Sequence, residues 1–216
     1  MRKNIAIFLS FLFISITSVK AETMIGITGA LHMLDVSGTE TTRSSGERNT
    51  GSESENAVVP EFFIEKEADG VALGLSYVPT KNMGSKSRTD TNSEGSSGTY
   101  RAEAELSDVF QVYVDYTVSQ YAGADIYLKG GLQFATIETL ESLNSGSTYP
   151  NEDVYGFTLG IGAKGALPYG NNLFYKADIT YTEFTDYEND DEAGTGNKVE
   201  ADLNDTAVKF SVGYKF

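Results

Sequence analysis

The amino-acid sequence predicts an all-β fold, an eight-stranded antiparallel up-and-down transmembrane β-barrel. Three observations lead to this prediction. Hydrophobic side chains recur at every second position in eight separate segments, which is the period of a strand with one apolar face. The connections between these segments are alternately long and short. Glycine and other small residues collect on the face opposite the apolar one.

The chain begins with a segment typical of secretory signal peptides. Two basic residues precede an apolar run over residues 5–19, and small side chains stand at Val19 and Ala21. The run is short for a helical membrane span, which needs about 20 residues. The sequence therefore predicts a signal peptide over 1–21 and one β-barrel domain over 22–216.

The charge and the cysteine content exclude several classes of function. The formal net charge is −15, and removal of the signal peptide takes away three basic residues and no acid, which leaves −18. Nucleic-acid binding is disfavoured because phosphate contacts need basic patches. The chain has no cysteine, so it can form neither a disulfide nor a thiolate metal site. We expect no cofactor, no metal centre and no enzymatic activity.

The last segment shows the alternation most clearly. Apolar residues fill the even positions of 208–216, whereas the apolar residues of 199–203 are odd. This change of parity predicts a β-bulge or a break near Asn204 and Asp205. The eight predicted strands are 25–34, 57–65, 71–78, 100–118, 124–137, 153–167, 173–187 and 199–216.

The connections place their long members at one end of the predicted barrel. In an up-and-down sheet, alternate connections lie at opposite ends, and outer-membrane barrels have long external loops and short periplasmic turns. The segments 37–56 and 79–99 are polar, so we expect them to be solvated and without order of their own. The long connections are 37–56, 79–99, 139–152 and 188–198, and the short ones are 66–70, 119–123 and 168–172.

The small residues decide which face points outward. Gly156, Gly160 and Gly162 share one face of a single segment, and glycine weakens a strand that faces water. An eight-stranded lumen has just enough room for small side chains. We therefore expect the apolar face to meet lipid and the sheet to close on itself, because hydrocarbon leaves no partner for unpaired backbone groups. The same rule places Leu106 and Phe110 on the lipid face.

Charged residues on the inner face predict a network inside the lumen. Such charges must be paired or solvated. They could form a salt-bridged plug or a charged constriction for small solutes, and the small strand number favours the plug. The predicted network comprises Glu61, Glu65, Arg101, Glu103, Asp115, Lys129, Lys164, Lys176, Asp178, Lys209 and Lys215.

His32 is the single histidine, and its parity places it inside the barrel towards the long-loop end. A catalytic role would need partners such as Ser76 and an acid, which the sequence cannot bring together. A structural role is therefore favoured over a catalytic base. The acidic segment 186–205 is interpreted as a solvated loop that could bind divalent cations, although its spacing differs from that of an EF-hand.

The mature chain resembles the small eight-stranded outer-membrane β-barrels of the OmpA transmembrane domain, OmpX and opacity-protein type. The signal peptide, the eight alternating segments and the tail over 210–216 carry this resemblance. It implies a bacterial outer-membrane location, contact with outer-membrane lipid and lipopolysaccharide, and a monomer. It also implies insertion by the barrel-assembly machinery, for which the implied C-terminal signal is Phe210, Val212, Tyr214 and Phe216. The resemblance does not extend to the periplasmic peptidoglycan-binding domain of full-length OmpA, so we do not expect anchoring to the cell wall by that route.

Four functions remain open at this point. The first is a structural or surface-interaction role in the cell envelope, with long loops outside. The second is a narrow OmpW-like channel or a barrel that binds small molecules. The third is an envelope enzyme that acts on lipid A through His32, and the fourth is a soluble lipocalin-like barrel.

Overall fold

Eight strands form the wall of the molecule in the computed structural model. The structure describes residues 21–91, 97–139, 148–168, 170, 172–190, 192 and 194–216, without the side chains of 82–86, 88–91, 97–98 and 100–102. The predicted signal peptide thus lies almost wholly outside the described residues, and the first strand begins directly after Ala21. The wall strands are β1 (Glu22–Thr41), β2 (Arg48–Ala68), β3 (Val71–Val78), β5 (Ser97–Tyr121), β6 (Ala124–Thr139), β7 (Glu152–Ala166), β8 (Leu173–Phe184) and β10 (Lys198–Lys215).

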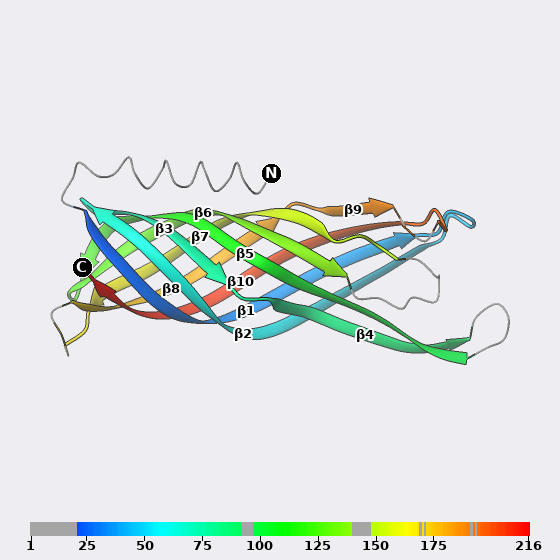
Figure 1. Ribbon diagram of the computed structural model, residues 1–216, viewed down its shortest axis with the longest axis horizontal. Helices are drawn as coiled ribbons and strands as arrows, with labels where there is room; N and C mark the ends of the chain where they lie inside the picture. Colours follow the sequence, from blue (N-terminus) through cyan, green and yellow to red (C-terminus); the bar gives the residue numbers. More distant parts are fainter. Residues whose placement is uncertain are drawn as a thin grey trace.

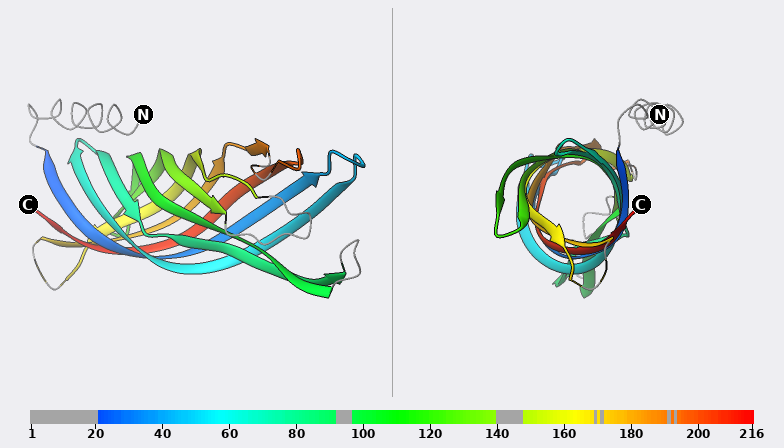
Figure 2. Two further views of the ribbon diagram at one scale, coloured as in Figure 1. Left: turned by 45° about the vertical axis from the view of Figure 1, so that its right-hand side comes forward. Right: turned by 90° about the vertical axis from the view of Figure 1, so that its left-hand side faces the viewer.

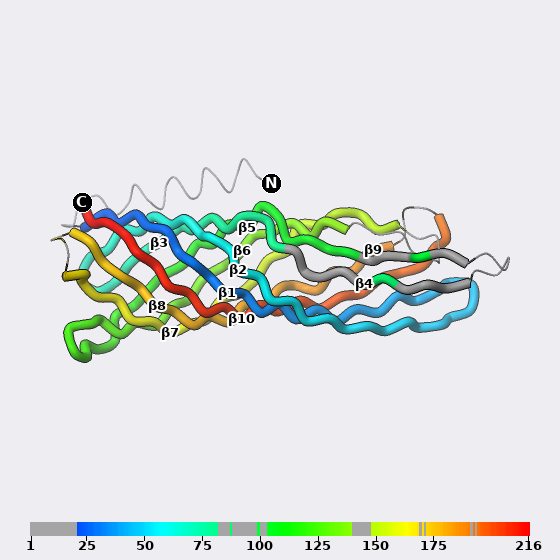
Figure 3. Tube along the Cα trace, turned by 90° about the horizontal axis from the view of Figure 1, so that it is seen from below, coloured from blue at the N-terminus to red at the C-terminus, as the bar shows by residue number. Residues whose placement is uncertain are grey.

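The sheet closes into a ring, as predicted. Each wall strand pairs antiparallel with its neighbour in the chain, and β10 returns to β1 with an unbroken register from Met24↔Lys215 to Thr41↔Lys198. Figure 2 shows the ring end-on, and Figure 3 shows the tilted first and last strands side by side. The predicted eight-stranded up-and-down barrel is confirmed. Within the described part of the chain, no helix is long and apolar enough to cross a membrane.

Tight turns and the C-terminus gather at one end of the barrel, where β1 also begins (Figure 1). Asp69 and Gly70 connect β2 to β3, and Ala122 and Gly123 connect β5 to β6. All four residues have positive φ, between 51° and 84°. Two-residue hairpin turns with two positive φ angles match the twist of the flanking strands, which explains the short connections.

The middle of the barrel carries an apolar outer surface. Large hydrophobic side chains point outward from every wall strand, and those of Phe110, Phe157 and Phe210 are 51%, 56% and 58% exposed. Residues of the opposite parity are buried, including Thr158 and Glu65, which are both fully enclosed. Apolar side chains therefore face outward around the barrel and polar ones face inward, as the sequence predicts.

The expectation of unordered long connections is wrong for two of them. The segment 37–56 continues the β1–β2 ladder, so that the turn spans only 42–47. The segment 79–99 contains β4 (Lys81–Thr91), which pairs with β5, and 188–198 overlaps β9 (Tyr187–Asp190), which pairs with β10. Composition measures the apolar area that side chains can bury, but a ladder that is already anchored in the barrel grows by backbone pairing alone.

Leu106 faces the interior and not lipid, contrary to the prediction. The register between β5 and β6 shifts between Ser107 and Phe110, and Asp108 has a positive φ of 51°. An inserted residue of this kind exchanges the two faces of a strand. The residues that follow Asp108 in β5 keep the predicted faces, whereas Leu106, which precedes it in the sequence, is fully buried.

The predicted irregularity near Asn204 and Asp205 is also wrong. β10 is one continuous strand here, and its ladder with β1 runs through both residues without a shift, while on its other side the pairing passes from β8 at Asn204 to β9 at Ala201. Leu203 and Asp205 both point inward, and Leu203 is buried in an apolar cluster near the long-loop end. The apparent change of parity arises because hydrophobic residues face lipid in the middle of the barrel and face the interior above it.

Candidate functional site: the filled barrel interior

The interior consists of three layers that follow one another along the strands. A small apolar group of Met24, Phe63, Ala72 and Phe174 lies towards the turn end. Ten buried ionisable side chains occupy the next layer, and we call them the charge network. Its members are His32, Glu61, Glu65, Lys81, Asp115, Lys129, Lys176, Asp178, Asp205 and Lys209.

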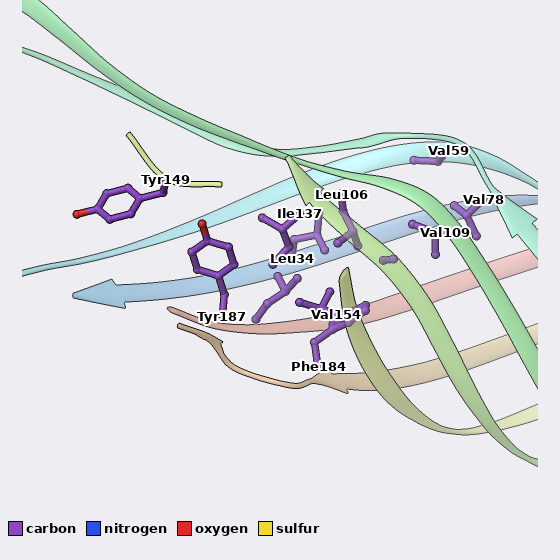
Figure 4. Close-up of a cluster of buried hydrophobic side chains, with 12 residues drawn as sticks. Leu34, Val59, Val78, Leu106, Val109, Ile137, Tyr149, Val154, Phe184 and Tyr187 are labelled. Atoms are coloured by element: carbon purple, nitrogen blue, oxygen red, sulfur yellow. The ribbon is translucent and has the colours of Figure 1, made fainter. Parts of the chain in front are cut away.

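The third layer is an apolar cluster at the long-loop end (Figure 4). Tyr149 and Tyr187 lie towards the outer end of the cluster, where the Tyr149 hydroxyl donates to Glu40 at 3.0 Å and the Tyr187 hydroxyl donates to the Pro150 carbonyl at 2.7 Å. These bonds attach the segment around Pro150 across the top of the cluster. The buried members of the apolar cluster are Leu34, Val59, Val78, Leu106, Val109, Ala135, Ile137, Tyr149, Val154, Phe184, Tyr187 and Leu203.

Lys176 is the centre of the lower half of the charge network. Its Nζ atom donates to Glu65 and, at 2.6 Å, to Asp115, and Asp115 also lies 2.8 Å from the Nζ atom of Lys129. The Tyr113 hydroxyl donates to Glu65 at 2.7 Å. Lys129 also lies 3.8 Å from Asp178 and 3.6 Å above the centre of the Tyr113 ring, so a cation–π contact adds to its two acid partners.

His32 is the centre of the upper half. Its Nδ1 atom lies 2.7 Å from Asp205 and its Nε2 atom 3.0 Å from Glu61. Lys81 donates to Asp205 at 2.9 Å, and Lys209 lies 2.9 Å from Glu61. Two acids, two lysines and the imidazole ring therefore form one connected group of buried side chains.

Glycine residues make the room in which two tyrosine rings cross the lumen. A Cβ atom on Gly74 would lie 2.2 Å from the Tyr113 ring, and one on Gly162 would lie 2.4 Å from the Tyr127 ring. The Tyr127 hydroxyl donates to Asp178. The small inner-face residues that predicted the orientation of the sheet thus allow large polar side chains to fill the interior.

The charge network leaves almost no free volume. A cavity of about 20 Å³ lies among Glu61, Tyr113, Lys129, Lys176 and Asp178. A cavity of this size holds about one water molecule. The described side chains therefore fill the lumen at this level as a plug.

Comparison with solved structures identifies this architecture. The chain is similar to the outer membrane protein OprG of Pseudomonas aeruginosa, with a TM-score of 0.60, 15% sequence identity, and coverage of 92% of this chain and 96% of that chain. The chain has the fold of the outer-membrane β-barrels. At 15% identity, this likeness establishes the fold and no shared activity.

More distant likenesses involve other barrels of outer-membrane proteins. The outer membrane protease OmpT of Escherichia coli has a TM-score of 0.49 and 10% identity over 90% of this chain and 97% of that chain. The N-terminal β-barrel domain of OprF of P. aeruginosa has a TM-score of 0.46 and 14% identity over 92% and 98%. No protein-family model and no curated protein sequence matches this chain.

The outer-membrane barrel fold brings together seven of the eleven side chains predicted to line the lumen network. Lys164 is also buried but forms a separate pair with Glu67 nearer the turn end. Lys215 pairs with Glu22 at the rim, where both are partly exposed, and the side chain of Arg101 lies outside the described residues. Glu103 belongs to the β4–β5 hairpin, on the face of β5 opposite to buried Leu106. The seven predicted side chains that do belong to the charge network are Glu61, Glu65, Asp115, Lys129, Lys176, Asp178 and Lys209.

The sequence analysis did not place Lys81 or Asp205 in the charge network, and it placed His32 inside the barrel without identifying its partners. Lys81 fell in a segment assigned to a loop, and Asp205 fell at the expected irregularity. Asp205 shares odd parity with Lys209, so unbroken alternation in β10 would have placed it inside. No local signal shows that Lys81 reaches Asp205, because their contact joins strands 124 residues apart.

The two remaining sequence predictions concern the surface. Phe210, Val212, Tyr214 and Phe216 all point outward, with exposed fractions of 42–70%, and their role as an assembly signal stays a prediction. The acidic segment 186–205 forms β9 and the first half of β10. Among the described residues, no group of three His, Asp or Glu side chains is arranged to hold a metal ion.

Proposed function

We propose that this protein is a monomeric, closed barrel of the bacterial outer membrane that presents rigid polar hairpins to the outside and has no catalytic role. The filled lumen carries this proposal. Ten buried ionisable groups and two crossing tyrosines occupy its middle, and a cavity of about 20 Å³ remains there. Open aqueous channels belong to barrels with about 16–18 strands.

The hairpins support a role at the surface. The β1–β2 ladder continues to Thr41↔Arg48, and the β4–β5 ladder continues to Thr91↔Ser97. Both hairpins extend well beyond the ends of β6 and β8, as Figure 1 shows. Side chains over 48–54 are all exposed and mostly polar. Backbone pairing gives such a surface a fixed shape, which a partner can contact without an ordering cost.

Conductance in planar bilayers tests closure. We expect the refolded, heat-modifiable protein to give no resolved unitary currents under conditions in which a 16-stranded porin conducts. Resolved currents from the folded fraction would contradict a closed barrel and would favour a narrow channel.

Trypsin treatment of intact cells tests location and orientation. Arg43 lies in the turn of the β1–β2 hairpin, Arg48 directly follows it, and both are exposed. We expect cleavage there without permeabilisation, while the remaining barrel stays in the outer-membrane fraction. Cleavage that occurs only after permeabilisation would contradict this orientation.

One observation favours a second candidate, a barrel that binds an apolar small molecule. Among the described ladder pairs, those between β2 and β3 end at Phe62↔Tyr77, and β4 pairs with β5 alone. The described ladders therefore leave a gap between β2 and β4 above this pair. Val59 and Val78 of the apolar cluster lie beside the gap. Saturable binding of an apolar fluorescent probe, abolished by Leu106→Asp in a variant that still folds, would support it. Non-saturable partitioning would leave the closed structural role.

Substitution of His32 tests whether the protein lacks catalytic activity. The ring is 1% exposed and both of its nitrogens face carboxylates, so no atom of it is free to meet a substrate. We expect His32→Ala to leave lipid A unchanged by mass spectrometry. A change in lipid A would instead indicate an envelope enzyme.

A further inference from the structure

His32 lies between two carboxylates that come from different strands. On β1, its Nδ1 atom is 2.7 Å from Oδ2 of Asp205 on β10, and its Nε2 atom is 3.0 Å from Oε1 of Glu61 on β2. The other charged groups that face this site are Lys81 from β4 and Lys209 from β10. All five side chains are buried, with exposed fractions of 1–6%.

This geometry favours a proton on each ring nitrogen. An ionised carboxylate only accepts hydrogen bonds, so a contact of 2.7–3.0 Å needs a donor on the histidine side. A neutral imidazole has one N–H group and can satisfy one acid, whereas an imidazolium satisfies both. Lys81 also lies 3.2 Å from Nδ1, but that longer contact arises because both groups converge on the same Asp205 oxygen.

The charges of the network lead to the same conclusion. It contains five carboxylates and four lysines, so it is balanced when His32 carries the fifth positive charge. The upper half then has an excess of one positive charge and the lower half an excess of one negative charge. The two halves are adjacent, since Lys209 and Asp178 are register partners on β10 and β8. An unbalanced charge in a buried site of low dielectric constant is costly.

We propose that the barrel interior is closed around one retained proton, carried by His32 between Glu61 and Asp205, and that loss of this proton loosens the plug. Lys81 extends the effect outside the lumen, because it stands at the first position of β4 and is anchored to the same Asp205 oxygen. The proton therefore stabilises both the filled interior and the root of the β4–β5 hairpin.

Ring ¹⁵N NMR of the folded barrel in micelles tests the protonation state directly. The chain contains one histidine, so its ring signals need no assignment. We expect both ring nitrogens to be protonated at pH 7.5, a pH at which a free imidazole is mostly neutral. A neutral ring with a single N–H group would overturn the proposal.

Charge rescue distinguishes a counter-charge from a simple packing role. We expect His32→Gln to lower the melting temperature at pH 7.5 by several degrees, because it leaves five acids and four lysines. Asp205→Asn also removes the acid that Lys81 contacts, but it restores the balance of four and four only in the His32→Gln background. It should therefore lower the melting temperature less in that background than in the wild type. An equal or larger loss in the His32→Gln background would show that charge balance is not what His32 provides.

The pH dependence supplies an independent reading of the same variants. If the folded state holds a proton that the unfolded state releases, the free energy of unfolding falls as the pH rises. The wild-type melting temperature should therefore fall more between pH 6 and pH 9 than that of His32→Gln. Asp35→Asn, an exposed acid on the outer face of β1, is the matched control and should follow the wild type. Equal slopes for wild type and His32→Gln would contradict a retained proton.

Discussion

Lys176 shows what a charged side chain needs in order to lie inside a narrow barrel. Its ammonium group contacts two acids, Glu65 and Asp115, and it lies 5.1–5.4 Å from the ring centres of Phe63, Tyr113 and Tyr127. The aromatic rings exclude water, while the acids supply the charge that water would otherwise solvate. A buried group of this kind depends on every one of its partners.

Lys176→Met should destabilise the barrel by about 3–5 kcal/mol, because it leaves two buried carboxylates without their shared cation. Chemical unfolding followed by far-ultraviolet circular dichroism measures this change. Lys215→Met removes a rim lysine that pairs with exposed Glu22, and it should cost less than about 1 kcal/mol. Equal losses for the two variants would show that burial of the network contributes nothing.

Gly213 is the clearest case of a glycine required by space. A Cβ atom there would lie 2.4 Å from the Phe174 ring and 2.6 Å from the Ile25 carbonyl oxygen, which the β1–β10 ladder holds in place. Gly213→Ala should therefore cost about 1–3 kcal/mol through overpacking. Gly29→Ala, on the outer face with open space around it, should be neutral or stabilising by up to about 1 kcal/mol. The same unfolding measurement compares them, and an unaffected Gly213→Ala would contradict this packing.

At the scale of the element, the bulge in β5 sets which face of the upper strand points inward. Asp108 supplies one extra residue with a φ of 51°, and Leu106 above it turns into the apolar cluster. Asp is tolerated at such a backbone conformation, whereas a β-branched residue is strained there. The bulge thereby converts a lipid-facing parity into a core-facing one within a single strand.

Substitutions at Asp108 should separate backbone strain from side-chain loss. Both substitutions remove the Asp108 side chain, and only valine introduces strain at positive φ, so Asp108→Val should destabilise the protein by about 1–3 kcal/mol more than Asp108→Gly. Differential scanning calorimetry in detergent would measure both. A larger loss for glycine than for valine would mean that the Asp108 side chain, and not the backbone, maintains the bulge.

The elements also show why the sequence predicted most of the wall and only part of the network. Alternation over 208–216 or 153–167 identifies a strand and its lipid face, because a single environment acts on all outward residues. It fails at Leu106 and Leu203, where the environment changes from lipid to water and the apolar face changes side. The contact of Lys81 with Asp205 depends on ring closure and on β4, neither of which is encoded locally.

The whole molecule combines two opposite solvation patterns in one ring of strands. Around the middle, apolar residues face outward and a charge network fills the inside. Above it, polar side chains such as Arg48 face outward and apolar residues such as Leu34 and Phe184 fill the inside. The upper half thus resembles a water-soluble barrel, and each wall strand changes pattern where it would leave the hydrocarbon. We expect this boundary to set the depth of the barrel in a membrane.

The last strand allows insertion in the cell to be separated from stability. Phe216 is 70% exposed at the end of the chain, and the centre of its ring lies 5.0 Å from the centre of the Tyr214 ring. If the C-terminal residues are read by the assembly machinery, Phe216→Ala should reduce the protein in the outer-membrane fraction several-fold. The purified variant should still refold in detergent with a loss below about 1 kcal/mol, because little of the ring is buried. Phe157→Ala, which removes another outward-facing ring from β7, is the control and should insert normally. Equal amounts of all three proteins in the membrane would show that Phe216 contributes only apolar surface.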